Sequence, residues 1–328
     1  LVGSEMCIRD REKYADAKSE LEKVISSGKY DLIADVSTFY HPASAGCKEY
    51  VLECVRHYDP SNMYSQEGWF GILANWGFGY GFIAGPEASM HYKFNTTSGY
   101  SYFNPSKSLY DAFVAEEGAD GYRLNAWIRT WEQVIAMNIA VNTTTNKYAS
   151  EGYFRLKWLA STDDEFVGYW CGNQSNTPVI RYADVLLMAA EACLQAGDQA
   201  GADEYLGRVR DRARLPRKSH VTLSDIKLER RLELAMEGMR FQDLKRWGDA
   251  PAVLADKGKK LPTFQIVPDP NNDLTTAAGI YNARYTTKTT YVDNEKSLAG
   301  WTPNRDEWLP FPENELEVNS NLKQNPGY

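Results

Sequence analysis

Helical patterning between residues 178 and 247 constrains the fold of this chain more than any other feature. The stretch RYADVLLMAAEACLQA at residues 181–196 is apolar over most of its length, and AGADEYLGRVRDRAR follows at residues 200–214. Gly197-Asp198 separates the two stretches and Pro216 ends the second. Helices joined by so short a turn pack against each other in opposite directions. We therefore predict an antiparallel helical hairpin over residues 178–215.

A second amphipathic stretch lies near the start of the chain, at residues 12–27, and Gly28 follows where a helix is expected to stop. Its spacing of small and large apolar residues resembles the second helix of a tetratricopeptide unit. We therefore predict a mainly α fold with a tetratricopeptide-like helical scaffold, although any packing of two helices would use such spacing. The matching residues are Ala17, Leu21 and Val24 in one stretch and Ala202, Leu206 and Val209 in the other.

Residues 223–247 form a third helical segment. We expect Ser224 to cap its start, Gly238 to interrupt it, and Phe241, Leu244 and Trp247 to face inward after the interruption. Its apolar face consists of Leu228, Leu232, Ala235, Met236 and Met239. The charged residues that we expect around this face are Glu229, Arg230, Arg231, Glu233, Glu237 and Arg240.

The rest of the chain is irregular and rich in glycine, proline and aromatic residues. We predict short regular pieces at 108–118 and 127–142, the second an alternating run that would supply strands as minor β structure, and no long helix after residue 248. Residues 1–11, LVGSEMCIRDR, resemble translated adaptor sequence, so we expect a non-native leader on an N-terminally truncated fragment. The expected parts, all packed as one unit, are a helical-repeat remnant (12–59), a loop-rich ligand-binding region (60–177), the helical repeat with its following helix (178–262) and an irregular C-terminal region (263–328).

An aromatic-rich segment at residues 64–103 is the main candidate binding site. It holds twelve aromatic residues and seven glycines but only three charged residues. Flat rings on neutral loops suit the apolar faces of sugar rings, and tyrosine and tryptophan add polar groups for sugar hydroxyls. The opposing interpretation is that these rings bury loops against the helices. The predicted ligand-binding residues are Trp69, Asn75, Trp76, Tyr80, Tyr92 and Tyr100.

Charge and motif content exclude several classes of function. Lys and Arg number 36 against 44 Asp and Glu, which gives a net charge of −8 and argues against nucleic-acid binding. The phosphate-loop motif GxxxxGK[ST], the zinc motif HExxH and the hydrolase motif GxSxG do not occur. The five cysteines form no CxxC pair. We therefore predict no enzyme, no cofactor and no metal site.

Several weaker patterns remain as alternatives. A glycoside hydrolase would need two carboxylates about 5–9.5 Å apart beside the aromatic residues, and the acidic run at 163–165 is one source. A helical scaffold that binds peptide or protein is another alternative. The uncharged run at 68–86 approaches the length of a membrane span, but its glycines oppose a helix. Asp269-x-Asn271-x-Asp273 begins like a calcium loop, yet Ile280 occupies the twelfth position.

The cationic residues at 208–218 also need an interpretation. This cluster would suit a phosphate-binding site, but acidic residues lie before it and within it. Its members are Arg208, Arg210, Arg212, Arg214, Arg217 and Lys218. We predict internal salt bridges, with Asp203, Glu204 and Asp211 among the partners.

Three stretches together carry a family resemblance. They are RYADVLLMAAEACLQAGD with the helix after it, ERRLELAMEGMRFQDLKRWG, and the terminal WLPFPENELEVNSNLKQNPGY. In order and spacing this chain resembles the RagB/SusD family of surface glycan-binding lipoproteins of Bacteroidetes, from about residue 12 to residue 328. The residues that match the helix motif of the family, and for which the resemblance implies a structural role, are Arg231, Glu233, Glu237, Arg240, Asp243 and Arg246.

The resemblance implies a function as well as a fold. It implies a helical scaffold that carries an irregular ligand-binding part, non-catalytic binding of a glycan, and a TonB-dependent transporter of the SusC type as partner. It also implies a lipid anchor in the outer membrane, which the family carries on an N-terminal cysteine that this chain does not show.

Overall fold

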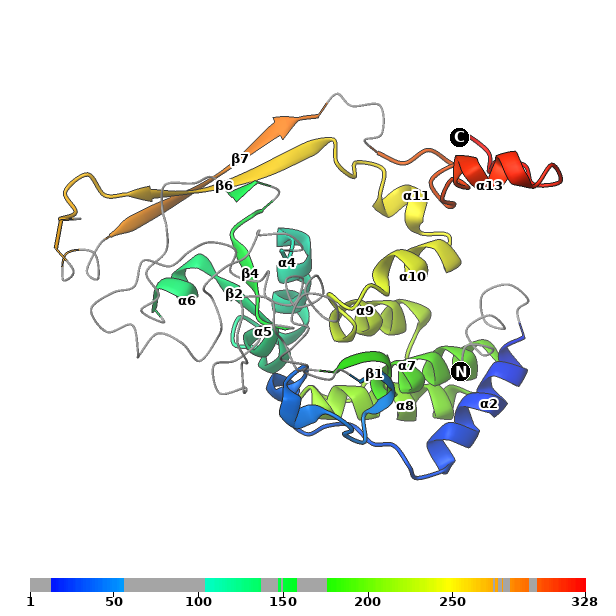
Figure 1. The fold of residues 1–328 in the computed structure, drawn as a ribbon. Helices are drawn as coiled ribbons and strands as arrows, with labels where there is room; N and C mark the ends of the chain where they lie inside the picture. The colour runs from blue at the N-terminus through cyan, green and yellow to red at the C-terminus, as the bar shows by residue number, and fades with distance from the viewer. Residues whose placement is uncertain are drawn as a thin grey trace, which may run out of the picture.

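The computed structural model describes residues 13–55, 104–136, 147–148, 150–157, 176–273, 275–276, 279, 284–294 and 300–328. These residues form a mainly helical molecule with small sheets (Figure 1). The helices α2, α7 and α8 lie together at one end, and α9, α10 and α11 lead away from them. The strands β6 and β7 form a long ribbon on the far side, and the C-terminus lies near α13. The predicted fold class is confirmed.

The predicted helical hairpin is α7 (Tyr182–Gln195) followed by α8 (Gln199–Arg212), and the helix predicted near the start is α2 (Tyr14–Ser26). Gly197, between α7 and α8, has a φ of 81°, which a glycine adopts without strain. Helix α7 is apolar on nearly every side because α2, α8 and α9 all pack against it. Ala17 and Ala202 are fully buried in this core, as expected for small residues that allow helices to approach closely.

Helix α9 (Leu223–Glu233) differs from the prediction at both ends. Thr222, rather than Ser224, caps it, because the Thr222 side chain accepts from the Asp225 backbone while the Asp225 side chain accepts from the Thr222 backbone. The helix stops at Glu233, and a turn containing Gly238 at φ 84° leads to α10 (Arg240–Arg246). Leu244 faces inward as predicted, whereas Phe241 is exposed and lies beside the Trp301 ring on the outer side of α10.

The α9 cap makes a pH-dependent contribution to stability. Partial burial acts to raise the pKa of Asp225, but hydrogen bonds from Thr222 and the nearby Lys218 outweigh burial and lower that pKa to about 2. Because the folded-state pKa is depressed, the stabilisation is complete above the ordinary value of 3.8 and is lost as the pH falls through about 2.

We therefore expect Asp225→Asn to lower the free energy of unfolding by about 1–2 kcal/mol at neutral pH. The difference from the unsubstituted protein should shrink steadily between about pH 4 and pH 2, measured by urea unfolding at several pH values. Asp256→Asn, at a highly exposed carboxylate, is the control and should show almost no difference at any pH. A deficit in Asp225→Asn that stays constant down to pH 2.5 would contradict this account.

A second core lies beside the first and contains α4 (Lys107–Glu117), α5 (Tyr122–Trp127) and the short 3-10 helix η1 (Val36–Thr38). A further 3-10 turn, η2 (Pro42–Ser44), follows η1. Of the run at 127–142 the structure describes residues 127–136, where β2 (Ile128–Thr130) is a strand and α6 (Trp131–Ala136) follows directly. Strand gives way to helix here because Thr130 and Gln133 hydrogen-bond each other's backbone N–H groups, as in a capping box.

The strands form three small antiparallel sheets. Strand β1 (Tyr50–Cys54) pairs with β5 (Thr177–Arg181), and β2 pairs with β4 (Tyr153–Arg155). The third sheet has the order β3-β6-β7, with the bounds Lys147–Tyr148, Lys260–Pro268 and Tyr285–Asp293.

The β6–β7 ribbon lies in a part of the chain, residue 263 onward, for which the sequence predicts irregular structure. Strand β6 contains Pro262 and Pro268, residues that usually mark loops. Pro268 is the last residue of β6, and Pro262 lies beyond the two residues that pair with β3, so neither interrupts that ladder. Helices α11 (Ala250–Val253) and α13 (Glu313–Val318) are both short, as predicted for this part of the chain. Across the described residues, no helix has both the length and the apolarity needed to span a bilayer.

Candidate functional site

The six predicted ligand-binding residues, from Trp69 to Tyr100, all lie outside the described residues, so their arrangement stays a prediction. The acidic run at 163–165, on which the hydrolase alternative depends, also lies outside them. The structure does describe the scaffold on both sides of these segments. The candidate site is therefore built from that scaffold upward.

The chain enters the aromatic-rich segment from β1 and leaves it into α4. At the entry, Cys54 on β1 pairs with Thr177 on β5, so the last described residues before 56 lie beside the first described residues after 175. At the exit, the Lys107 backbone N–H donates to Glu151 Oε2 at 2.6 Å, and the Tyr110 ring stacks on Tyr153 at 4.5 Å. Both ends of the segment are thus held by contacts to residues distant in sequence.

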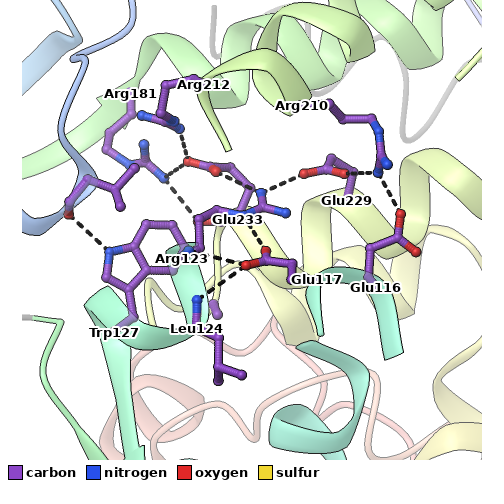
Figure 2. A network of polar contacts seen from close by, with 12 residues as sticks. Glu116, Glu117, Arg123, Leu124, Trp127, Arg181, Arg210, Arg212, Glu229 and Glu233 are labelled. Atoms are coloured by element: carbon purple, nitrogen blue, oxygen red, sulfur yellow. Dashed lines mark hydrogen bonds and ion pairs between the residues drawn. The ribbon is translucent and has the colours of Figure 1, made fainter. Parts of the chain in front are cut away.

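Behind these attachment points lies a buried network of ion pairs centred on Glu233 of α9 (Figure 2). Arg123 Nη1 lies 3.0 Å from Glu233 Oε2, and Arg181 Nη2 lies 3.1 Å from Glu233 Oε1. Arg212 Nη2 also contacts Glu233 Oε1. Since Glu233 is fully buried and none of the three arginine side chains is more than 4% exposed, these charges depend on one another rather than on water.

The network continues from Glu233 in two directions. Toward α4, Arg123 contacts Glu117 at 2.6 Å and Glu229 at 2.5 Å. Arg210 Nη1 lies 3.0 Å from Glu229 and 2.6 Å from Glu116, and so links these two carboxylates. Figure 2 shows these side chains converging from α4, α5, α8 and α9. Seven carboxylates and six cations make up the network: Glu49, Glu116, Glu117, Asp225, Glu229, Glu233 and Glu237 with Arg123, Lys157, Arg181, Arg210, Arg212 and Lys218.

In the other direction the network reaches the strands that hold the candidate site. Arg181, the last residue of β5, contacts Glu49 at 2.5 Å just before β1 and Glu237 at 2.7 Å. Lys157 directly precedes residues 158–175, and its Nζ lies 2.6 Å from Glu237 Oε1 and 3.7 Å from the centre of the Trp127 ring. The network therefore fixes Lys157, the last described residue before 158–175, and the ends of β1 and β5 that lie opposite to the Cys54–Thr177 pair.

Burial and charge act against each other on these groups. Burial raises the pKa of Glu49 and of Glu117 despite their arginine partners. Burial also opposes ionisation of Glu233, but the three arginines outweigh it and hold the pKa of Glu233 well below its ordinary value. Burial lowers the pKa of Lys157 to about 8. Because these groups are sealed from solvent, the network suits a structural role rather than proton transfer to a ligand.

A second buried set joins α7, α9 and α10. Arg230 contacts Asp184 at 2.7 Å and Asp243 at 2.9 Å, and Arg246 contacts Asp243 at 2.8 Å and Glu191 at 2.5 Å. The structural role expected for Glu233, Glu237, Asp243 and Arg246 is confirmed. Glu229, Arg230 and Glu233, expected around the apolar face of α9, are themselves buried, because their partners on other helices draw them into the interior.

Most of the cationic residues at 208–218 form salt bridges within the molecule, as predicted, whereas the Arg214 guanidinium lies over the Tyr122 ring. Arg210 and Arg212 belong to the central network, and Arg217 contacts Glu204 and Asp211 at 2.6 Å each. Asp203 instead accepts the backbone N–H groups of His220 and Val221.

Two arrangements of described residues bear on metal binding. Asp269 and Asp273, from the calcium-like pattern, accept the backbone N–H groups of Asn271 and Thr275 in turns. Ligand atoms of Glu22, Cys193 and Asp198 lie within 4.8 Å of one another. Lys18 Nζ, 2.6 Å from Asp198 Oδ2, already supplies a cation there, and burial raises the pKa of Cys193 to about 12 and keeps its thiol protonated.

Comparison with known proteins decides the family. A model of the SusD family matches residues 48–328, which is most of the chain. The chain belongs to the SusD family. Among curated relatives, a SusD-like protein of Bacteroides ovatus is 31% identical over 170 residues, covering 46% of this chain and 29% of the relative. The SusD-like protein P38 of Formosa agariphila is 36% identical over 157 residues, covering 43% of this chain and 28% of the relative.

Solved SusD-like structures share the fold. A laminarin-binding SusD-like protein matches with a TM-score of 0.71 and 26% identity, over 100% of this chain and 61% of that protein. Surface glycan-binding protein A from Bacteroides thetaiotaomicron, in complex with laminarihexaose, matches with a TM-score of 0.65 and 22% identity, over 98% of this chain and 62% of that protein. This chain thus spans less than a third of the length of those curated SusD relatives and about three fifths of these solved chains.

Proposed function

We propose that this protein binds oligosaccharide or polysaccharide at the cell surface, without catalysis, and delivers it to a TonB-dependent outer-membrane transporter of the SusC type. In this proposal a lipid anchor holds the protein to the outer membrane. The observation that carries the proposal is an aromatic-rich segment whose two ends are anchored in a SusD scaffold.

Two SusD-like structures support a glycan as the ligand. One is named for laminarin binding and the other contains laminarihexaose. In this chain, the residues we propose for ligand contact are Trp69, Asn75, Trp76, Tyr80, Tyr92 and Tyr100. The rings would stack on sugar faces, and Asn75 and the tyrosine hydroxyls would hydrogen-bond sugar hydroxyls. A shallow site of this kind gives modest affinity, since it excludes little water.

Replacing two tryptophans tests the proposal. We expect Trp69→Ala/Trp76→Ala to weaken glycan binding at least tenfold, about 1.4 kcal/mol or more, because stacking area is lost. The measurement is isothermal titration of laminarihexaose and a panel of soluble polysaccharides into the protein and its variant. Matched thermal unfolding curves would show that both proteins are folded.

Trp308→Ala is the matched control, because Trp308 is 53% exposed and lies near the C-terminus, away from the aromatic-rich segment in sequence. Its binding should equal that of the unsubstituted protein. Equal affinity of the double variant for every glycan would remove the aromatic residues from the site. Failure of the entire panel, with binding of a peptide instead, would favour the helical-scaffold alternative.

A further inference from the structure

Strand β7 forms the edge of the three-stranded sheet and is nine residues long. In the described part of the chain β7 pairs with β6 alone, so no described strand pairs with the backbone groups on its outer edge. Figure 1 shows the β6–β7 ribbon on the far side of the molecule from α7 and α8. A long strand edge of this kind is a ready template for a further strand.

Contacts to the body of the molecule hold this edge in place. Tyr291 of β7 donates its hydroxyl to Glu151 Oε1 at 2.6 Å. The neighbouring strand β6 is anchored by Phe264, which is buried and packs against the rings of Trp131 and Phe154. A partner strand would therefore meet an edge that is already fixed, which reduces the entropy lost on pairing.

The sequence of β7 indicates a second copy of the same strand as the partner. Residues 285–291 read YTTKTTY, which is the same in both directions about Lys288. Two such strands paired antiparallel about Lys288 place threonine opposite threonine on both sides of the centre. Threonines in opposite positions on neighbouring strands stabilise the pair. The opposing residues are Thr286 with Thr290 and Thr287 with Thr289, each pair formed twice.

Exposure and charge on β7 also suit this contact. Tyr291 and Val292 are both exposed, so a paired strand would cover apolar surface that now meets water. Lys288 is exposed and is the single charged residue of the YTTKTTY run. At the centre of the pairing it faces Lys288 of the second copy, and like charges in opposite positions weaken a strand pair. The pairing is therefore sensitive to charge at this one position.

We propose that two copies of this chain pair through their β7 edges, antiparallel and centred on Lys288, to form one sheet that continues across both copies. A contact of one strand edge is small, so we expect a weak dimer that forms at high protein concentration. The pairing does not depend on the proposed function, because it uses none of the residues proposed for glycan contact. Under that function, the dimer would present two binding segments to one polysaccharide and so bind it more tightly.

Exchanging the central charge tests both the partner and the register. Lys288→Glu alone again places like charges opposite each other, whereas an equal mixture with the unsubstituted protein places a carboxylate opposite an ammonium group. We expect dimers in the mixture to be about tenfold tighter than those of either protein alone. Sedimentation velocity over a range of protein concentrations measures this, and the gain should shrink at high salt.

A second variant removes the central charge instead of exchanging it. We expect Lys288→Thr to dimerise about threefold more tightly than the unsubstituted protein, because threonine then faces threonine at the centre as well. Lys323→Glu is the matched control, since Lys323 is exposed near the C-terminus and the chemical change is that of Lys288→Glu. A mixture of this control with the unsubstituted protein should gain nothing. Matched thermal unfolding curves would show that all variants are folded.

Two results would overturn the proposal. One is a monomer at every concentration, in the charge-exchange mixture and in Lys288→Thr as well as in the unsubstituted protein. The other is a dimer whose strength does not respond to either change at Lys288, because a different surface or a different register would then form the contact. Neither result bears on glycan binding, which is measured separately by titration.

Discussion

Replacing Glu233 with glutamine is expected to lower the free energy of unfolding by about 3–5 kcal/mol, because its carboxylate is a shared partner of three buried arginines. Burying a charge without its partner costs far more than an exposed ion pair contributes. Glutamine keeps the size of the side chain, so the loss would arise from charge rather than from a cavity. Urea unfolding at neutral pH measures it.

Glu317→Gln is the matched control for this substitution, since Glu317 is exposed on α13 and the chemical change is identical. Its unfolding free energy should stay within about 0.5 kcal/mol of the unsubstituted protein. If Glu233→Gln were no more destabilising than Glu317→Gln, the buried network would not be what compensates Arg123, Arg181 and Arg212.

Replacing Trp127 with alanine should cost about 3–5 kcal/mol of unfolding free energy, for a different reason. The indole is 1% exposed and packs against the rings of Phe39 and Phe113. Its Nε1 donates to Val36 O at 3.1 Å, and its face lies 3.7 Å from Lys157 Nζ. Alanine would leave a cavity, an unmet carbonyl and a buried lysine without its ring.

Trp127→Phe separates these contributions, because phenylalanine retains a ring beneath Lys157 but donates no hydrogen bond to Val36. We expect an intermediate loss in denaturant unfolding, with Trp308→Ala close to the unsubstituted protein as the exposed control. A loss in Trp127→Ala no greater than that in Trp308→Ala would show that the second core does not depend on this residue.

The two substitutions also bear on the proposed site. Trp127 and Glu233 both contact residues of the scaffold around the undescribed segments: Trp127 lies beneath Lys157, which directly precedes residues 158–175, and Glu233 pairs with Arg181 at the end of β5. Binding by these variants should therefore be compared only below their unfolding transitions. Loss of binding in a folded Glu233→Gln protein would indicate that the network positions the ligand-binding segment as well as stabilising the fold.

Local patterning was sufficient to predict α2, α7 and α8. The spacing of Ala17 and Leu21, repeated at Ala202 and Leu206, reports one buried helix face, and Gly197 and Pro216 limit the hairpin. These signals work because residues three and four apart share a helix face whatever the rest of the chain does. The family resemblance depended on the same stretches and is confirmed over residues 48–328.

Strand β6 and the burial of charged residues on α9 were predicted less well, because both depend on contacts distant in sequence. Because prolines usually mark loops, the sequence did not predict strand β6. The register of β6 is set by its partner strand β7, from Lys260 opposite Asp293 to Pro268 opposite Tyr285. Local patterning placed the charged side chains of α9 around its apolar face but did not indicate that they are buried, because a charge is normally placed in water. No periodicity within α9 identifies which of its charges have partners elsewhere.

The sequence by itself therefore determined the helical scaffold, the family and the aromatic-rich segment proposed for binding. Only the tertiary structure decided that Glu233 meets Arg123, 110 residues away. The physical reason is the distance along the chain over which each interaction acts. Helix formation depends on neighbours within a few positions, whereas the free energy of a buried charge depends on whatever the whole fold places beside it.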